Sequence, residues 1–211
     1  MKLFITQNSY FFMHRIFLEI YENRQCKVLY VSEKKRGFFR KIKEIYNEFG
    51  FFNFFFIVIL EFIYYLLLFR RKSALDSEKI HDFQLNEKIK ILLESNKFNG
   101  VYSIGCPTKI DSNLQSFFGI TFYNLHGGIL PYQTGRFSPL KALKRKDEYL
   151  GATLHEISEE FDEGGIIKQD LFKPKSKSKL LNYVKVLKVS KKILSLHLKE
   201  ENYKSTNLDK S

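Results

Sequence analysis

The first thirty residues alternate between apolar runs and an amphipathic segment, and this order constrains the fold more than any other feature. Met1–Thr6 is a short apolar run, and Cys26–Val31 (CKVLYV) has the composition of a buried strand. Between them, Asn8 or Ser9 can cap a helix that runs to Asn23 with apolar residues along one side. A strand, a helix and a strand at this spacing begin a βαβ unit. We therefore expect an α/β fold with a parallel sheet.

The rest of the chain continues this alternation. We expect a Rossmann-like, doubly wound, mostly parallel sheet with flanking helices, followed by a C-terminal helix. The expected helices are Leu85–Lys97, Ile110–Phe118, Ser138–Lys146 and Ser178–Lys199, and the expected strands are Asn99–Gly105, Ile120–Asn124, Ala152–Ile157 and Ile166–Phe172. We assign residues 1–175 to one catalytic domain and residues 176–211 to a C-terminal helix and a polar tail. No glycine stands in TQNSYFF after the first strand, so neither a dinucleotide fingerprint nor a P-loop is indicated.

Length and composition exclude some classes of protein for this chain. The 211 residues suit one domain, and 44% hydrophobic residues exclude a disordered chain. Lysine and arginine number 35 against 23 acids, which gives a net charge of +12. The abundance of Lys, Ile, Asn and Phe is typical of an AT-rich coding sequence, so we do not interpret this charge as a sign of nucleic-acid binding.

The cysteines and the N-terminus indicate a compartment. Cys26 and Cys106 lie in runs that resemble buried strands, which favours two core thiols in a reducing environment over a disulfide. The N-terminus lacks the basic region, apolar run and cleavage site of a secretory signal. We therefore expect a cytoplasmic protein.

A nearly continuous apolar segment, Phe51–Phe69, is followed directly by three cations at 70–72. The segment is long enough to span a bilayer. However, a single crossing would separate the first βαβ half from the later polar motifs, and Asn53 and Glu61 disfavour the lipid centre. A membrane span is therefore the least favoured interpretation of this insert, and two others are preferred. The insert is either an interfacial helix that makes peripheral contact with the inner face of the membrane, or a helix buried in the core or in a homodimer face.

Polar side chains gather at the ends of two expected strands. Asn124 and His126 are two residues apart at the end of a strand, so their side chains project from the same face. The following glycines and Pro131 favour a tight loop. A later strand contains His155 and leads to an acidic loop with Asp162. Since ligands bind at the carboxyl ends of parallel strands, these residues predict a polar site there.

This block resembles the catalytic half of the folate-dependent formyltransferase family. The family includes glycinamide ribonucleotide transformylase, methionyl-tRNA formyltransferase and sugar N-formyltransferases, and its pattern is Asn-x-His, a Leu-Pro loop followed by glycine, Thr-x-His and Asp-x-Gly. The chain has these elements in the same order and spacing, as Asn124–His126, Leu130–Pro131 with Gly135, Thr153–His155 and Asp162–Gly164. The resemblance extends over Asn99–Leu171.

The resemblance implies a reaction and three catalytic residues. Formyl transfer from N10-formyltetrahydrofolate to an amine passes through a tetrahedral intermediate, which requires proton transfer and a donor to the oxyanion. By resemblance, Asn124 donates to the formyl oxygen and His126 supplies a proton and a donor. Asp162 orients His126 and moves a proton from the amine. His155 matches a family histidine that is structural rather than catalytic.

The resemblance also implies which residues bind the folate. They form two walls that contribute mainly backbone groups: Cys106, Pro107, Thr108, Lys109 and Ile110 in one, and Ser158, Glu159, Glu160 and Phe161 in the other. We expect no metal site, because metal ligands would not explain Asn124 or the loop glycines.

Two departures from the family pattern concern the acceptor. Many relatives have Pro-Ser at Gly127-Gly128, and an Arg-Gly pair where this chain has Thr134-Gly135 followed by Arg136. The absence of a phosphate-binding loop disfavours the purine-pathway enzyme, and the residues after Phe172 leave no room for the barrel domain of methionyl-tRNA formyltransferase. We therefore expect an N-formyltransferase that acts on a nucleotide-linked amino sugar in surface-polysaccharide synthesis, without nucleic acid. The alternatives are a formyltetrahydrofolate hydrolase and a membrane-associated binding protein that has lost catalysis.

Overall fold

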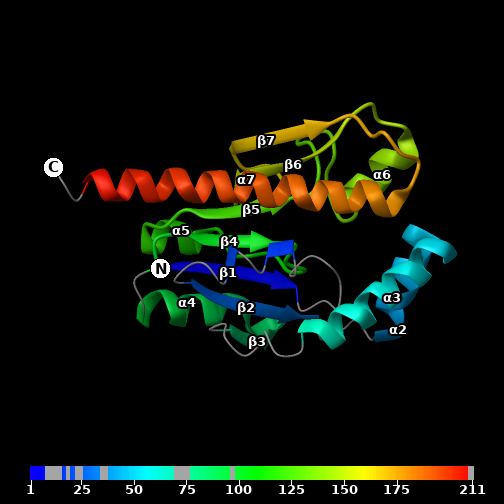
Figure 1. Cartoon of the computed structure of the whole chain (residues 1–211). Coiled ribbons are helices and arrows are strands. Elements are labelled where there is room, and N and C mark those ends of the chain that lie inside the picture. The colour runs from blue at the N-terminus through cyan, green and yellow to red at the C-terminus, as the bar shows by residue number, and fades with distance from the viewer. Residues whose placement is uncertain are drawn as a thin grey trace.

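A seven-stranded sheet forms the centre of the protein (Figure 1). The computed structural model describes residues 1–7, 16–17, 20–21, 26–33, 38–68, 77–95 and 98–208. Its strands are β1 (Lys2–Gln7), β2 (Cys26–Ser32), β3 (Ser77–His81), β4 (Val101–Ile104), β5 (Phe122–His126), β6 (Leu150–Glu156) and β7 (Ile166–Phe172). Their order in the sheet is β3-β2-β1-β4-β5-β6-β7. Strands β1 to β5 run parallel to one another, and β6 is antiparallel to both of its neighbours, β5 and β7. This confirms the mostly parallel, doubly wound sheet.

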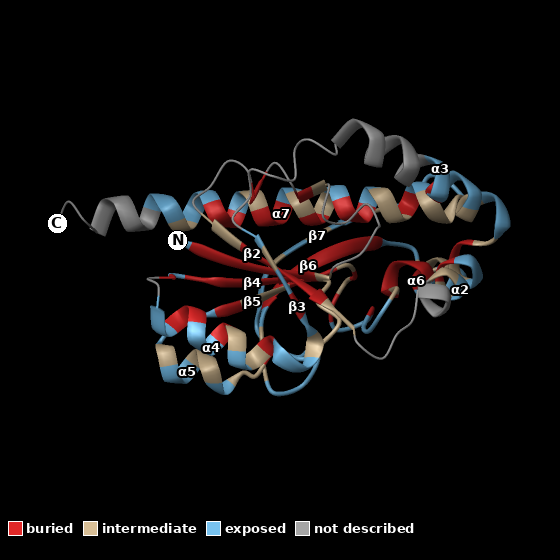
Figure 2. Cartoon of the chain, turned by 90° about the horizontal axis from the view of Figure 1, so that it is seen from below, coloured by how far each residue is buried: buried red, intermediate tan, exposed pale blue. Residues whose placement is uncertain are grey.

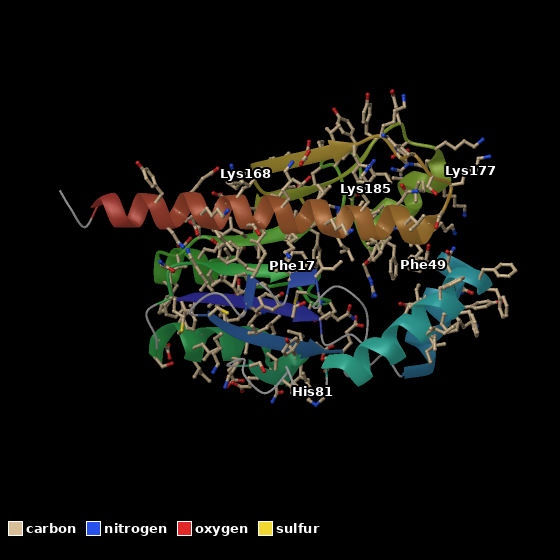
Figure 3. The ribbon with its side chains drawn as sticks, viewed as in Figure 1. Phe17, Phe49, His81, Lys168, Lys177 and Lys185 are labelled. Atoms are coloured by element: carbon tan, nitrogen blue, oxygen red, sulfur yellow. The ribbon has the colours of Figure 1, made fainter. Side chains whose placement is uncertain are left out.

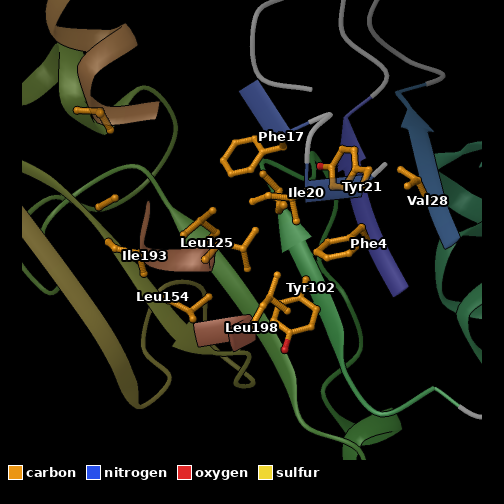
Figure 4. Packing of buried hydrophobic residues seen from close by; sticks show 14 of the residues in the cluster. Phe4, Phe17, Ile20, Tyr21, Val28, Tyr102, Leu125, Leu154, Ile193 and Leu198 are labelled. Atoms are coloured by element: carbon orange, nitrogen blue, oxygen red, sulfur yellow. The ribbon is translucent and has the colours of Figure 1, made fainter. Parts of the chain in front are cut away.

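Helices cover both faces of this sheet (Figure 2). They are α2 (Phe38–Phe49), α3 (Phe51–Leu68), the short 3-10 helix η2 (Asp82–Gln84), α4 (Leu85–Ser95), α5 (Asn113–Phe118), α6 (Ser138–Arg145) and α7 (Lys179–Leu208). Side chains alternate along β1: Phe4 packs in a cluster with Leu194 and Leu198 of α7, whereas Leu3 and Ile5 pack in a cluster with residues of α4. Figure 4 shows Phe4, Tyr102 and Leu198 in the first cluster. A parallel strand buried on both sides is apolar throughout, as this sequence is.

The expected elements from Cys26 onward are found close to their predicted ranges, with three differences. The C-terminal helix α7 continues to Leu208, past the expected end at Lys199, and its additional turns include Glu201, which pairs with Lys2. β3 was not predicted, because Ile80 is its one buried residue and the strand lies at the edge of the sheet. Cys106 follows β4 instead of lying within a strand, since β4 ends at Ile104. Neither Cys26 nor Cys106 forms a disulfide in the described chain. The helix expected from Asn8 to Asn23 lies largely outside the described residues.

The apolar segment forms a helix that packs against α2. Gly50 joins α2 to α3 with a φ of 80°, a conformation that glycine adopts without strain. Ile57 of α3 is buried in a small cluster with Phe49 of α2 and Leu140 of α6. Within the part of the chain that the structure describes, none of the helices is long and apolar enough to cross a membrane.

A buried ion pair fixes the C-terminal half of α7 to the start of the chain. Lys2 Nζ and Tyr102 Oη each donate to Glu201 Oε2 at 2.5 Å, and His197 Nε2 lies 3.5 Å from Glu201 Oε1. Burial opposes ionisation of Glu201, but the hydrogen bonds from His197, Lys2 and Tyr102 outweigh it and lower the pKa to about 2. The ionised carboxylate therefore stabilises the contact between α7 and the amino ends of β1 and β4.

We expect Glu201→Gln to lower the free energy of unfolding by about 2–4 kcal/mol at neutral pH, because Lys2 loses its buried anion. The pKa of Glu201 is depressed in the folded protein, so its contribution is complete above the ordinary value of 4.5 and is lost as the pH falls towards about 2. The difference between wild type and variant in urea denaturation should therefore shrink over that range. Glu200→Gln is the matched control, because the Glu200–Lys168 pair is exposed and should contribute less than about 1 kcal/mol. Equal effects of both substitutions would contradict the assignment.

Candidate active site

A cavity of about 500 Å³ lies at the carboxyl ends of β4 and β5. These strands point to the same end of the sheet (Figure 1), next to the β1–β4 junction, where the strand order reverses direction. In open parallel sheets this junction is where ligands bind. The cavity is also lined by residues that follow β6, by the start of α6 and by the first half of α7.

The structure brings the three predicted catalytic residues together in this cavity. Asn124 and His126 lie on the same side of β5, and Asp162 lies in the loop between β6 and β7 with a φ of 63°. Asp162 Oδ1 is 3.4 Å from His126 Nδ1 and 3.8 Å from His155 Nε2. Among the residues described, no group of histidine, cysteine and acidic side chains could hold a metal ion.

The hydrogen bonds of His126 indicate which ring nitrogen carries a proton. His126 Nε2 lies 2.6 Å from the carbonyl oxygen of Gln133. A carbonyl oxygen can only accept, so Nε2 carries a proton. The other ring nitrogen, Nδ1, faces Asp162.

One loop holds both His126 and Asp162 through its backbone. The carbonyl group of Gln133 binds His126, and the backbone N–H of Gly135 donates to Asp162 Oδ2 at 2.9 Å. Backbone groups in an ordered loop lose little freedom on binding, so this arrangement fixes the distance between the two side chains before a substrate enters.

The side chain of Gln133 explains why this loop is ordered. It is 4% exposed and uses both ends of its amide. Its oxygen accepts from the backbone N–H of Ile129, and its nitrogen donates to Asp147 Oδ2 and to the carbonyl of Tyr149. Sequence analysis missed Gln133, because a glutamine in a loop gives no signal that its amide is buried.

His155 orients Asn124. Burial lowers the pKa of His155, which favours the neutral ring. Its Nδ1 lies 2.8 Å from the carbonyl oxygen of Glu156, so Nδ1 carries the proton and Nε2 accepts. The amide nitrogen of Asn124 lies 3.0 Å from that Nε2 and donates to it. One of the two amide hydrogens is thereby fixed, and the other remains for a ligand.

Both expected folate walls border the cavity, with one exception. Every residue from Cys106 to Ile110 lines it, as do Ser158, Glu160 and Phe161. Glu159 is exposed and is not among the lining residues. The walls approach each other where Lys109 Nζ lies 5.8 Å from the ring of Phe161.

Burial makes the thiol of Cys106 a poor nucleophile. Burial raises the pKa of Cys106 to about 12, so the thiol is protonated at neutral pH. A cysteine nucleophile reacts as the thiolate. Cys106 therefore contributes packing to the wall of the cavity.

The opposite side of the cavity was not predicted from the sequence. Its lining includes Phe17, which Figure 3 shows near the sheet, and residues Tyr183, Val186, Leu187 and Ser190 of α7. Arg136 also lines it, with guanidinium nitrogens 3.7 Å from Glu33 Oε1 and 3.5 Å from Glu44 Oε2. These residues come from distant parts of the chain, so no local motif marks them.

Comparison with known proteins identifies the fold. Neither a family model nor a curated protein matches the chain. Among solved structures, phosphoribosylglycinamide formyltransferase from Campylobacter jejuni is similar at 19% identity and a TM-score of 0.61, over 95% of this chain and 96% of that one.

Two other similar solved structures are N-formyltransferases. A 4-N formyltransferase from Francisella tularensis matches at 18% identity and a TM-score of 0.60, over 96% of this chain and 69% of that chain. A sugar N-formyltransferase from a Shewanella species matches at 15% identity and a TM-score of 0.56, over 94% and 68%. The chain therefore has the fold that these formyltransferases share, as its sequence motifs suggest.

Proposed function

We propose that the protein is a cytoplasmic N-formyltransferase that moves the formyl group of N10-formyltetrahydrofolate to the amine of a nucleotide-linked amino sugar. The observation that supports this most directly is the meeting of Asn124, His126 and Asp162 in one cavity of a formyltransferase fold. These side chains supply an amide donor, an imidazole and a carboxylate, which are the groups that acyl transfer between two nitrogens requires.

Each residue has a separate part in this mechanism. As the acceptor nitrogen bonds to the formyl carbon, the free amide hydrogen of Asn124 stabilises the negative charge on the formyl oxygen. Asp162 takes the proton that the attacking amine loses, directly or through Nδ1 of His126. The carbon–N10 bond then breaks, and N10 receives a proton from the same pair, so the side chains return to their starting state.

The choice of a sugar acceptor rests on the sequence and on the comparisons together. The similar structures include both glycinamide ribonucleotide and sugar formyltransferases. No glycine occurs in TQNSYFF, which begins at the end of β1, and this disfavours a phosphate-binding loop of the purine-pathway kind. We therefore favour a nucleotide-linked amino sugar, formylated for surface-polysaccharide synthesis, over glycinamide ribonucleotide as the acceptor.

The direct test is a mass-spectrometric assay with purified protein, N10-formyltetrahydrofolate and a panel of acceptors. The panel contains nucleotide-linked 3-amino and 4-amino sugars and glycinamide ribonucleotide. We expect one amino sugar to gain a formyl group, and Asp162→Asn and His126→Ala each to lower the rate by at least about 100-fold while the protein stays folded. Turnover of the folate without a formylated acceptor would indicate a hydrolase. Formylation of glycinamide ribonucleotide would identify that compound, and not an amino sugar, as the acceptor.

A second prediction concerns Gly128, which allows the close approach of His126 to its partners. A Cβ atom at Gly128 would lie 2.4 Å from the carbonyl oxygen of Gln133, 2.7 Å from Ser138 Oγ and 2.8 Å from His126 Nε2. Gly128→Ala should therefore separate the imidazole from the carbonyl that fixes its protonation. We expect a loss of at least about tenfold in kcat, measured in the formyl-transfer assay.

Gly127 offers the matched control for this substitution. A Cβ atom there would meet Val186 at 3.5 Å and Pro139 at 3.7 Å, which are ordinary contact distances. Gly127→Ala should accordingly keep a rate close to that of wild type. A similar loss of kcat in both variants would mean that the loop tolerates no added side chain at either glycine. The loss could then not be assigned to the contact between His126 and Gln133.

A further inference from the structure

The most unusual surface of the molecule is the outer side of α3. We call its exposed residues Phe51, Phe52, Phe55, Phe56 and Ile59 the α3 patch; their exposed fractions run from 38% to 81%. The spacing of these residues places them on one side of the helix. The opposite side includes Ile57, which is buried, and Phe54, which packs against the same cluster. α3 therefore already has an inner contact, and the patch is a second apolar face.

The α3 patch contains several neighbouring exposed apolar side chains instead of a single one. Single apolar side chains are common on protein surfaces, but contiguous aromatic groups mark sites that bind a protein or a membrane. Figure 2 shows the described first half of α3 as mostly exposed, at the outer end of the molecule. The patch can therefore contact a large, flat partner without obstruction from the sheet.

Cations surround this end of the protein. Exposed lysines occur on α2 (Lys43), on and just after α6 (Lys141, Lys144 and Lys146) and in the link between β7 and α7 (Lys175 and Lys177). None of these six pairs with an acid in the portions of the chain that the structure describes. α2, α3, α6 and the start of α7 pack together, since Ile45, Ile57, Leu140 and Leu180 share one cluster. Figure 3 shows Lys177 and Phe49 at this same end.

We propose that the α3 patch and its surrounding lysines dock the protein on an anionic membrane surface. Aromatic side chains bury their rings at the lipid interface, and nearby lysines gain attraction from negatively charged headgroups. In the sequence, Arg70, Arg71 and Lys72 follow soon after α3.

A second copy of the chain is a less suitable occupant. A symmetric dimer places the same patch on both subunits. It would therefore bring the lysines of one subunit close to those of the other, and like charges facing each other oppose association. An anionic lipid surface can bury the apolar side chains of the patch and also attract the lysines around it.

Docking at this site would place the cavity close to the membrane. The ring of Phe49 on α2 lies 5.4 Å from that of Tyr183, and Glu44 on α2 pairs with Arg136. Tyr183 and Arg136 both line the cavity. The proposal does not depend on the reaction that the cavity performs, and it can be tested without an activity assay.

The experiment is sedimentation of the full-length protein with vesicles of phosphatidylcholine, with and without phosphatidylglycerol. We expect binding to the anionic vesicles that decreases at high salt. Phe52→Ser combined with Phe56→Ser should weaken it at least about tenfold, because two exposed rings can no longer be buried in lipid. Lys175→Gln combined with Lys177→Gln should weaken binding to anionic vesicles and reduce its salt dependence.

Phe117→Ser is the matched control, because Phe117 is 70% exposed and lies on α5, at the other end of the molecule (Figure 1). Its binding should equal that of wild type, and circular dichroism should show that all variants are folded. The proposal is overturned if wild type binds no vesicles, or if the double phenylalanine variant binds as wild type does. It is also overturned if light scattering shows a dimer that only the phenylalanine variant loses, because a second copy then covers the patch.

Discussion

The structure depends on a parallel sheet that must be covered on both faces. Alternate residues of β1 point to opposite sides, so the sheet is stable in water only when helices bury both sets. α7 provides the cover on one face along much of its length. Its second half is fixed by the ion pair of Lys2 and Glu201, and its first half lines the cavity. The same helix therefore stabilises the fold and shapes the site.

Within the site, the backbone of one loop limits the freedom of His126 and Asp162. The carbonyl group of Gln133 accepts a hydrogen bond from His126, and the N–H group of Gly135 donates one to Asp162. A side chain at Gly128 would occupy the space between these partners. Many members of the family that the sequence resembles have serine at this position. The position of His126 in this protein is therefore linked to a residue that departs from the family pattern.

The sequence was sufficient for six of the seven strands and for the polar motif. Apolar runs predicted β1, β2 and β4 to β7, although no residue of β7 is fully buried, and the two-residue spacing of Asn124 and His126 placed both on one face. The edge strand β3 was missed because Ile80 is its one apolar residue, which leaves no pattern. The contribution of α7 to the cavity, and the buried amide of Gln133, depend on contacts between distant segments. A periodic pattern shows which face of a helix or strand is apolar. It does not show which other segment of the chain packs against that face.

Net charge illustrates the same limit. The value of +12 carried no functional meaning by itself, because residue usage explains an excess of lysine as well as selection for binding does. Position in the fold adds information that the count lacks. Lys2 and Lys192 are neutralised by acids, whereas Lys43, Lys141 and Lys177 lie without such partners around one apolar helix, as far as the described chain extends. Exposed lysines also occur elsewhere, for example Lys79 on β3 and Lys90 on α4. The lysines near α3 are therefore informative because exposed aromatic side chains lie beside them, and not because of their number.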